Sequence, residues 1–135
     1  MTISLNDLKL VNTKINLLPY KSEPVDDWIP ITEAGGDCDS YATAKFERLF
    51  LMGWPNNFLR FAICYVEPFK LIDEITGELR DATMKERCHL VLLVDWDGQT
   101  WVLDNRHPLP MEYDLLPYKW HLLQVAGTQN WEKVS

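Results

Sequence analysis

A cysteine that follows two glycines is the first candidate for chemistry in this sequence. Gly35 and Gly36 precede Asp37 and Cys38, and apolar residues then recur at helical spacing. Asp37 or Ser40 is suited to begin that helix as its N-cap residue. A thiol in the first turn of a helix lies at the positive end of the helix dipole, which favours the thiolate. The pattern predicts a nucleophilic cysteine, with a small buried core cysteine as the alternative.

A predicted β-hairpin carries the second candidate group. Residues 88–95 are almost continuously apolar, which is typical of a central strand covered on both faces. Asp97-Gly98 is a strong hairpin turn, and residues 99–105 return as the second strand. With a two-residue turn, the side chains of His89 and Asp104 fall on one face as diagonal neighbours, within reach of a hydrogen bond. A three-residue loop would place them on opposite faces, so the register decides whether they meet.

Together these residues suggest a nucleophile, a base and an orienting acid. Cys38 would attack, His89 would take its proton, and Asp104 would orient the imidazole. The alternatives are a hydrogen-bonded core histidine and an aspartate that ends a strand. His107 is a poorer base because it precedes a proline in a loop, and His121 is poorer because it lies in the tail with no acid at strand spacing.

The remaining pattern indicates the elements that position this group. A first helix begins at Ser4 and ends near Pro19, and its Asn12 and Asn16 are expected to be solvated or bonded to a neighbouring loop. Trp28 lies on the loop before Cys38, either as an indole donor to an oxyanion or as a loop anchor. Further elements are a strand at 59–66, a hairpin or mobile loop at 70–82, and a proline-containing tail that wraps the domain from residue 106.

Composition excludes several classes of function. The chain has 135 residues, which fits a single domain over 1–135. Its formal charge of −7 argues against nucleic-acid binding, because phosphate contacts need clustered Lys and Arg. No apolar run approaches the ~20 residues that span a bilayer. Three cysteines fit no zinc pattern, so we expect free thiols, with Cys64 and Cys88 in the core.

The sequence resembles the bacterial transglutaminase-like cysteine proteinases, a family that includes periplasmic proteases that release biofilm adhesins. The resemblance covers most of the chain, and the order and spacing of its pieces are specific. These pieces are Asp27-Trp28-Ile29-Pro30, Gly36-Asp37-Cys38-Asp39, Tyr41-Ala42, Ala44-Lys45, Leu59-Arg60, Tyr65-Val66, His89-Leu90-Val91-Leu92, Val102-Leu103-Asp104-Asn105, Asp114-Leu115-Leu116-Pro117 and Trp131.

The resemblance implies a papain-like, transglutaminase-core α+β fold in which the nucleophile helix packs on an antiparallel sheet. It also implies Cys38 as nucleophile, His89 as base and Asp104 as the orienting acid. Adhesin-cleaving members depend on calcium held by acidic residues that flank the cysteine, which correspond to Asp37 and Asp39. Ser40 stands where the family often has another aspartate. The adhesin substrate itself is not carried over.

The expected function is hydrolysis of a peptide bond in a protein or peptide substrate through an acyl-enzyme. The alternatives are an acyl or amine transferase with the same triad, and a catalytically silent binding module on the same fold. Residues 1–10 lack the pattern of a secretory signal. We therefore expect a small stand-alone cytoplasmic member, with a phage virion or an unseen export route as the alternatives. The pattern indicates no oligomeric state.

Overall fold

The computed structural model describes residues 3–20, 37–66, 70–81 and 87–134. Two α-helices and two short 3-10 helices accompany the strands of two sheets. In chain order the elements are α1 (Leu5–Asn16), α2 (Cys38–Leu51), η1 (Asn56–Phe58), β1 (Leu59–Tyr65), β2 (Lys70–Ile72), β3 (Leu79–Asp81), β4 (Cys88–Trp96), β5 (Gln99–Leu103), β6 (Met111–Glu112), η2 (Tyr113–Leu115), β7 (Lys119–Gln124) and β8 (Trp131–Lys133).

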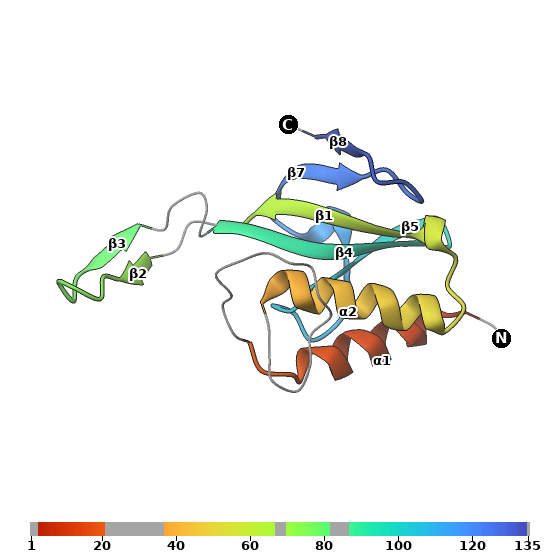
Figure 1. Ribbon diagram of the computed structural model, residues 1–135, viewed down its shortest axis with the longest axis horizontal. Coiled ribbons are helices and arrows are strands. Elements are labelled where there is room, and N and C mark those ends of the chain that lie inside the picture. Colours follow the sequence, from red (N-terminus) through yellow and green to blue (C-terminus); the bar gives the residue numbers. More distant parts are fainter. Residues whose placement is uncertain (1–2, 21–36, 67–69, 82–86, 135) are drawn as a thin grey trace.

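A six-stranded antiparallel sheet forms the centre of the protein, with strand order β6-β5-β4-β1-β7-β8. Both helices cover the same face of this sheet, and the β2–β3 hairpin projects away from it (Figure 1). This arrangement confirms the predicted α+β fold with the nucleophile helix packed on an antiparallel sheet. Among the described residues, no helix combines the length and the apolar character needed to cross a bilayer.

The turn between β4 and β5 has the predicted two residues. Asp97 and Gly98 have φ angles of 53° and 78°, as a tight hairpin turn with two left-handed positions requires. Trp96 pairs with Gln99, and the ladder continues from there to Leu92. The predicted register is therefore confirmed, and it puts the side chains of residues 89 and 104 on one face of the hairpin.

Apolar side chains fill both faces of the sheet. On the helix side, Leu92 and Val94 of β4 pack with residues of both helices in a cluster of Leu8, Val11, Leu49, Trp54, Leu59, Leu92, Val94 and Leu103. The alternate β4 residues pack on the other face in a cluster of Ala62, Cys64, Val91, Leu93, Val102, Leu116 and Trp120. β4 is thus buried on both faces, as its continuous apolar run predicts.

Candidate active site

The helix that carries Cys38 starts at the predicted residue. Asp37 has the extended backbone of an N-cap residue, and Cys38 is the first residue of α2. Asp37 is therefore the N-cap residue, as one of the two predicted candidates, although its side chain makes no capping hydrogen bond. Its Oδ1 is buried, and among the described residues it has no hydrogen-bond partner.

His89 and Asp104 form the hydrogen bond that the hairpin register predicts. His89 Nε2 lies 2.6 Å from Asp104 Oδ1, and the Asp104 side chain is fully buried. An ionised carboxylate can only accept, so Nε2 of His89 carries the proton in this bond. Nδ1 is then the ring nitrogen that remains for proton transfer.

Two further donors hold the Asp104 carboxylate. The Tyr118 hydroxyl donates to Oδ2 at 2.5 Å, and the Arg106 backbone N–H donates to Oδ1 at 2.9 Å. Burial alone would raise the pKa of Asp104, but the bonds from His89, Tyr118 and Arg106 outweigh it and lower the pKa to about 2. Asp104 is therefore ionised at neutral pH and keeps the His89 ring in one orientation.

The asparagines of α1 bind the loop that follows Asp104. Asn16 Nδ2 donates to the carbonyl oxygens of Asp104 and His107, at 2.9 Å each. Asn12 is fully buried and donates to His107 and Pro108. Of the two options that the sequence left open, the bond to a neighbouring loop is the one observed. That loop is the continuation of β5.

Cys38 and His89 line the same pocket, whose volume is about 310 Å³; its other described lining residues are Tyr20, Val66, Cys88, Asn105 and Arg106. The backbone of Leu90, the residue after His89, forms a hydrogen bond with the Cys38 thiol. The thiol itself points to Asp39 Oδ1 at 3.7 Å. Within the described residues no hydrogen bond joins it to the His89 ring, so the two groups are neighbours across a pocket.

The electrostatic environment of Cys38 differs from the sequence-based expectation. Burial raises the pKa of the thiol to about 12, and the charges of Asp39 and Asp37 add to this effect. The hydrogen bond from the Leu90 backbone acts in the opposite direction but is weaker. The prediction that the helix start favours a thiolate is therefore wrong for the free protein, and a base must take the proton.

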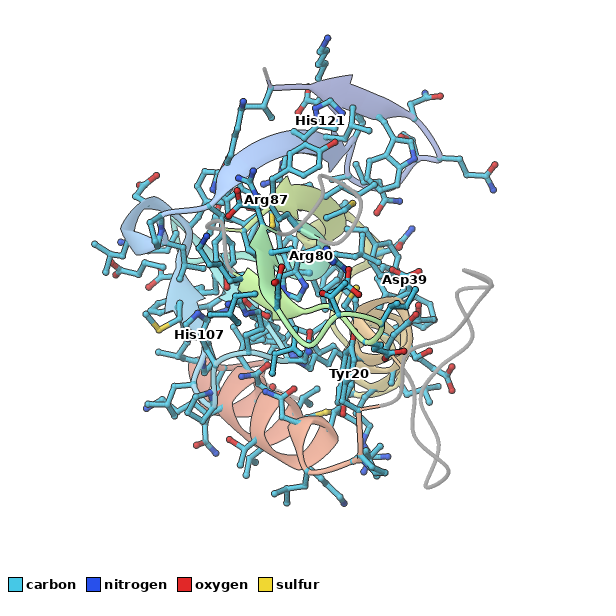
Figure 2. The ribbon with its side chains drawn as sticks, turned by 90° about the vertical axis from the view of Figure 1, so that its left-hand side faces the viewer. Tyr20, Asp39, Arg80, Arg87, His107 and His121 are labelled. Atoms are coloured by element: carbon cyan, nitrogen blue, oxygen red, sulfur yellow. The ribbon has the colours of Figure 1, made fainter. Side chains whose placement is uncertain are left out.

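Two other residues of the pocket, Cys88 and Tyr20, do not follow the sequence-based expectation. Cys88 was expected in the core, but its side chain is exposed at the start of β4, whereas Cys64 is buried as expected. Nothing in the sequence pattern marks Tyr20 as a pocket residue. Its ring stacks on Tyr41 at 6.2 Å, and it lies on the same side of the protein as Asp39, near the start of α2 (Figure 2).

Tyr118 is the other contact that sequence reasoning missed. It lies between η2 and β7, and its hydroxyl also lies 3.2 Å from His107 Nε2, in the loop beside α1 (Figure 2). No local pattern marks a tyrosine that reaches a carboxylate 14 residues earlier in the chain. The expected oxyanion donor Trp28 lies outside the described residues.

The two acidic residues beside Cys38 meet part of the requirement for calcium. Asp37 and Asp39 are both buried, with 8% of each residue exposed, and no described residue donates a hydrogen bond to Asp37 Oδ1. A calcium shell needs six to eight oxygens, so further ligands must come from elsewhere. Within the described part of the chain, no group of three or more His, Cys, Asp or Glu side chains gathers as a metal site. The described residues thus supply two candidate carboxylates and no complete calcium shell.

The arrangement of helices and strands is the transglutaminase-like α+β fold. Solved structures of LapG from Legionella pneumophila share it. The calcium-bound form matches with a TM-score of 0.68 at 21% identity, over 96% of this chain and 72% of that one. The EGTA-treated form matches with a TM-score of 0.64 at 19% identity, over 97% and 73%. At this identity the likeness concerns the fold. No protein-family model and no curated protein sequence matches the chain.

Proposed function

We propose that this protein is a cysteine peptidase that hydrolyses a peptide bond in a protein or peptide substrate. Cys38 is the nucleophile, His89 the general base and acid, and Asp104 the residue that orients the imidazole. One observation carries the proposal: the ring of a buried His–Asp pair and a cysteine at a helix start line the same pocket. The shared fold with LapG supports it at the level of architecture.

The proton path follows from the hydrogen bonds of His89. Because Nε2–H is bound to Asp104, Nδ1 is the atom that accepts the thiol proton of Cys38. The side chain of Cys38 must first rotate about χ1 away from Asp39 Oδ1. Hydrogen bonds between catalytic groups are often long or poorly aligned in free enzymes and tighten when substrate binds.

The reaction then proceeds in two halves. The sulfur attacks the scissile carbonyl carbon as its proton moves to Nδ1 of His89, and a tetrahedral oxyanion forms. Nδ1–H passes the proton to the leaving amine, the C–N bond breaks, and a thioester on Cys38 remains. Water then gives a proton to Nδ1 and attacks the thioester, which releases the carboxylic acid and restores the thiol. We assign Trp28 to the oxyanion as an indole donor.

Calcium at Asp37 and Asp39 belongs to the same proposal. The calcium-bound and EGTA-treated LapG structures support it, together with the buried Asp37 oxygen, to which no residue in the described part of the chain donates. A divalent cation there would supply positive charge next to the two carboxylates that raise the pKa of Cys38. The residues of this chain would hold it through carboxylate oxygens, with backbone carbonyls and water completing the shell.

The test uses a peptide library digested in ¹⁸O-labelled water, with and without an added primary amine. We expect new C-termini that carry ¹⁸O, formed by the parent and by Cys64→Ala, and absent with Cys38→Ala. Cys64 is a matched control because its thiol is buried outside the pocket. Incorporation of the amine in place of ¹⁸O would reassign the protein as a transferase. If Cys38→Ala kept the turnover of the parent, the nucleophile would be misassigned.

A further inference from the structure

Two fully buried polar side chains lie where the helices meet, and the proposed hydrolysis uses neither. Lys45 of α2 and Asn12 of α1 are both 0% exposed. Lys45 Nζ donates to Asn12 Oδ1 at 2.8 Å, its one hydrogen bond within the described residues. A buried ammonium with a single partner is less favourable than an apolar side chain of similar size. The pair therefore needs an explanation other than stability.

Asn12 carries the contact onward to a loop. Its Nδ2 donates to the carbonyl oxygens of His107 and Pro108, at 3.0 and 3.1 Å. A carbonyl oxygen can only accept, so the Asn12 Nδ2 group must face the two loop carbonyls and Oδ1 must face Lys45. Neither aspartate nor leucine at position 12 could make both sets of bonds.

The loop that Asn12 binds is the one that begins with Asp104. The His107 N–H donates to the Asp104 carbonyl oxygen at 3.2 Å, and Asn16 bridges the same two residues. At the other end of the chain of contacts, Lys45 follows Cys38 by two helical turns on one face of α2. The contacts thus run without a gap from the helix of the thiol to the segment of the orienting acid.

The charges of Lys45 and Asp104 also act on each other. Burial lowers the pKa of Lys45 to about 7, and the negative charge of Asp104 opposes that effect. The Tyr41 ring, 5.9 Å from Nζ, is a further contact of the ammonium. The hydrogen bonds through Asn12 and the charge interaction with Asp104 both connect Lys45 to the loop that begins with Asp104.

We propose that Lys45 and Asn12 are positioning residues for the hydrolysis described above: together they hold the Asp104 loop, and with it the His89–Asp104 pair, in place relative to the helix of Cys38. The role rests on the proposed function. It makes a structural claim that is testable without a substrate, because the His89 Nε2 proton is protected from solvent only while its bond to Asp104 stays closed.

The experiment measures exchange of the His89 Nε2 proton by ¹⁵N-resolved NMR in the full chain. Lys45→Met and Asn12→Leu remove the two ends of the contact, and the double variant removes both. Leu49→Ala is the control, because Leu49 is also fully buried on α2 but packs in the apolar cluster. All variants are brought to the same free energy of unfolding with urea, so general destabilisation cancels.

We expect Lys45→Met, which removes one buried hydrogen bond, to speed exchange about tenfold relative to Leu49→Ala. Asn12→Leu removes that bond and the two bonds to the loop, so it should speed exchange by at least the same factor. The double variant should exchange no faster than the faster single variant, because the two residues act as one unit. Equal rates in Lys45→Met and Leu49→Ala would overturn the proposal. Asn12→Leu provides the same test from α1 if Lys45→Met does not fold.

Hydrolysis by the same variants separates the two proposals. A slower kcat at unchanged KM for Lys45→Met, measured on a peptide that the parent cleaves, supports a positioning role. If both variants speed proton exchange but the parent cleaves no peptide of the library, the peptidase is refuted and the structural role of Lys45 and Asn12 stands.

Discussion

Tyr118→Phe isolates a single hydrogen bond to the buried acid of the candidate site. The substitution removes only the hydroxyl that donates to Asp104 Oδ2 at 2.5 Å. A hydrogen bond to a charged group contributes about 1.5–3 kcal/mol. The bonds from His89 and the Arg106 backbone remain, so we expect the lower end of this range. The variant should be destabilised by about 1.5 kcal/mol at pH 7.

The hydrogen bond from Tyr118 should also affect the pKa of Asp104, which it lowers. The pKa of this carboxyl is lowered from 3.8 to about 2, so Asp104 adds stability that is complete above about pH 4 and is lost as the pH falls through 2. Loss of 1.5 kcal/mol corresponds to a pKa higher by about 1 unit. The difference in unfolding free energy between parent and variant should therefore shrink as the pH falls from about 4 to about 2, the range between the ordinary and the lowered pKa of Asp104.

Two measurements check this reasoning, urea unfolding at several pH values and the ¹³C titration of the Asp104 carboxyl. Tyr113→Phe is the control, because Tyr113 stacks on Trp120 and its hydroxyl makes no hydrogen bond within the described residues. It should change neither quantity. A Tyr118→Phe protein with an unchanged pKa of Asp104, or with the same destabilisation at pH 7 and pH 2.5, would show that the bond does not favour the ionised acid.

Three further predictions concern the candidate site. In a background without the other two cysteines, alkylation of Cys38 should keep accelerating above pH 9, because its pKa is about 12; a plateau near pH 7 would contradict this. Asp104→Asn should lower kcat less than His89→Ala, since it disturbs orientation and keeps the base, and equal losses would count against these roles. Millimolar calcium, but not magnesium, should raise the melting temperature of the parent and of Glu47→Ala but not of Asp39→Ala; superimposed scans with calcium and chelator would remove the site.

The sequence was sufficient wherever a local pattern determined the geometry. The Asp97-Gly98 turn specifies a two-residue hairpin, and alternation along its arms then brings His89 to Asp104. The start of α2 at Cys38 followed from helical spacing in the same way. These predictions needed no knowledge of how distant segments pack.

Predictions that depended on tertiary packing were wrong or were not made. The helix start at Cys38 suggested a thiolate, but burial and the two neighbouring carboxylates dominate its pKa. Cys88 reads as a core residue of an apolar strand, yet it lies exposed at the strand end. The hydrogen bond from Tyr118 to Asp104 joins residues 14 positions apart, and the one from Lys45 to Asn12 joins residues 33 positions apart. No periodicity in the sequence predicts either contact.

The two-residue turn also determines which changes in length this chain could tolerate. His89 and Asp104 lie on the two arms of one hairpin, whose turn is formed by Asp97 and Gly98. A single residue inserted there turns the side chains of one arm to the opposite face of the hairpin and separates His89 from Asp104. The exposed β2–β3 turn around Gly77 can take an insertion without moving either arm. During divergence, insertions should therefore accumulate at residues 73–78 and be purged at 97–98. A library of one-residue insertions at both turns, selected for folded protein and then for turnover, would reveal that asymmetry.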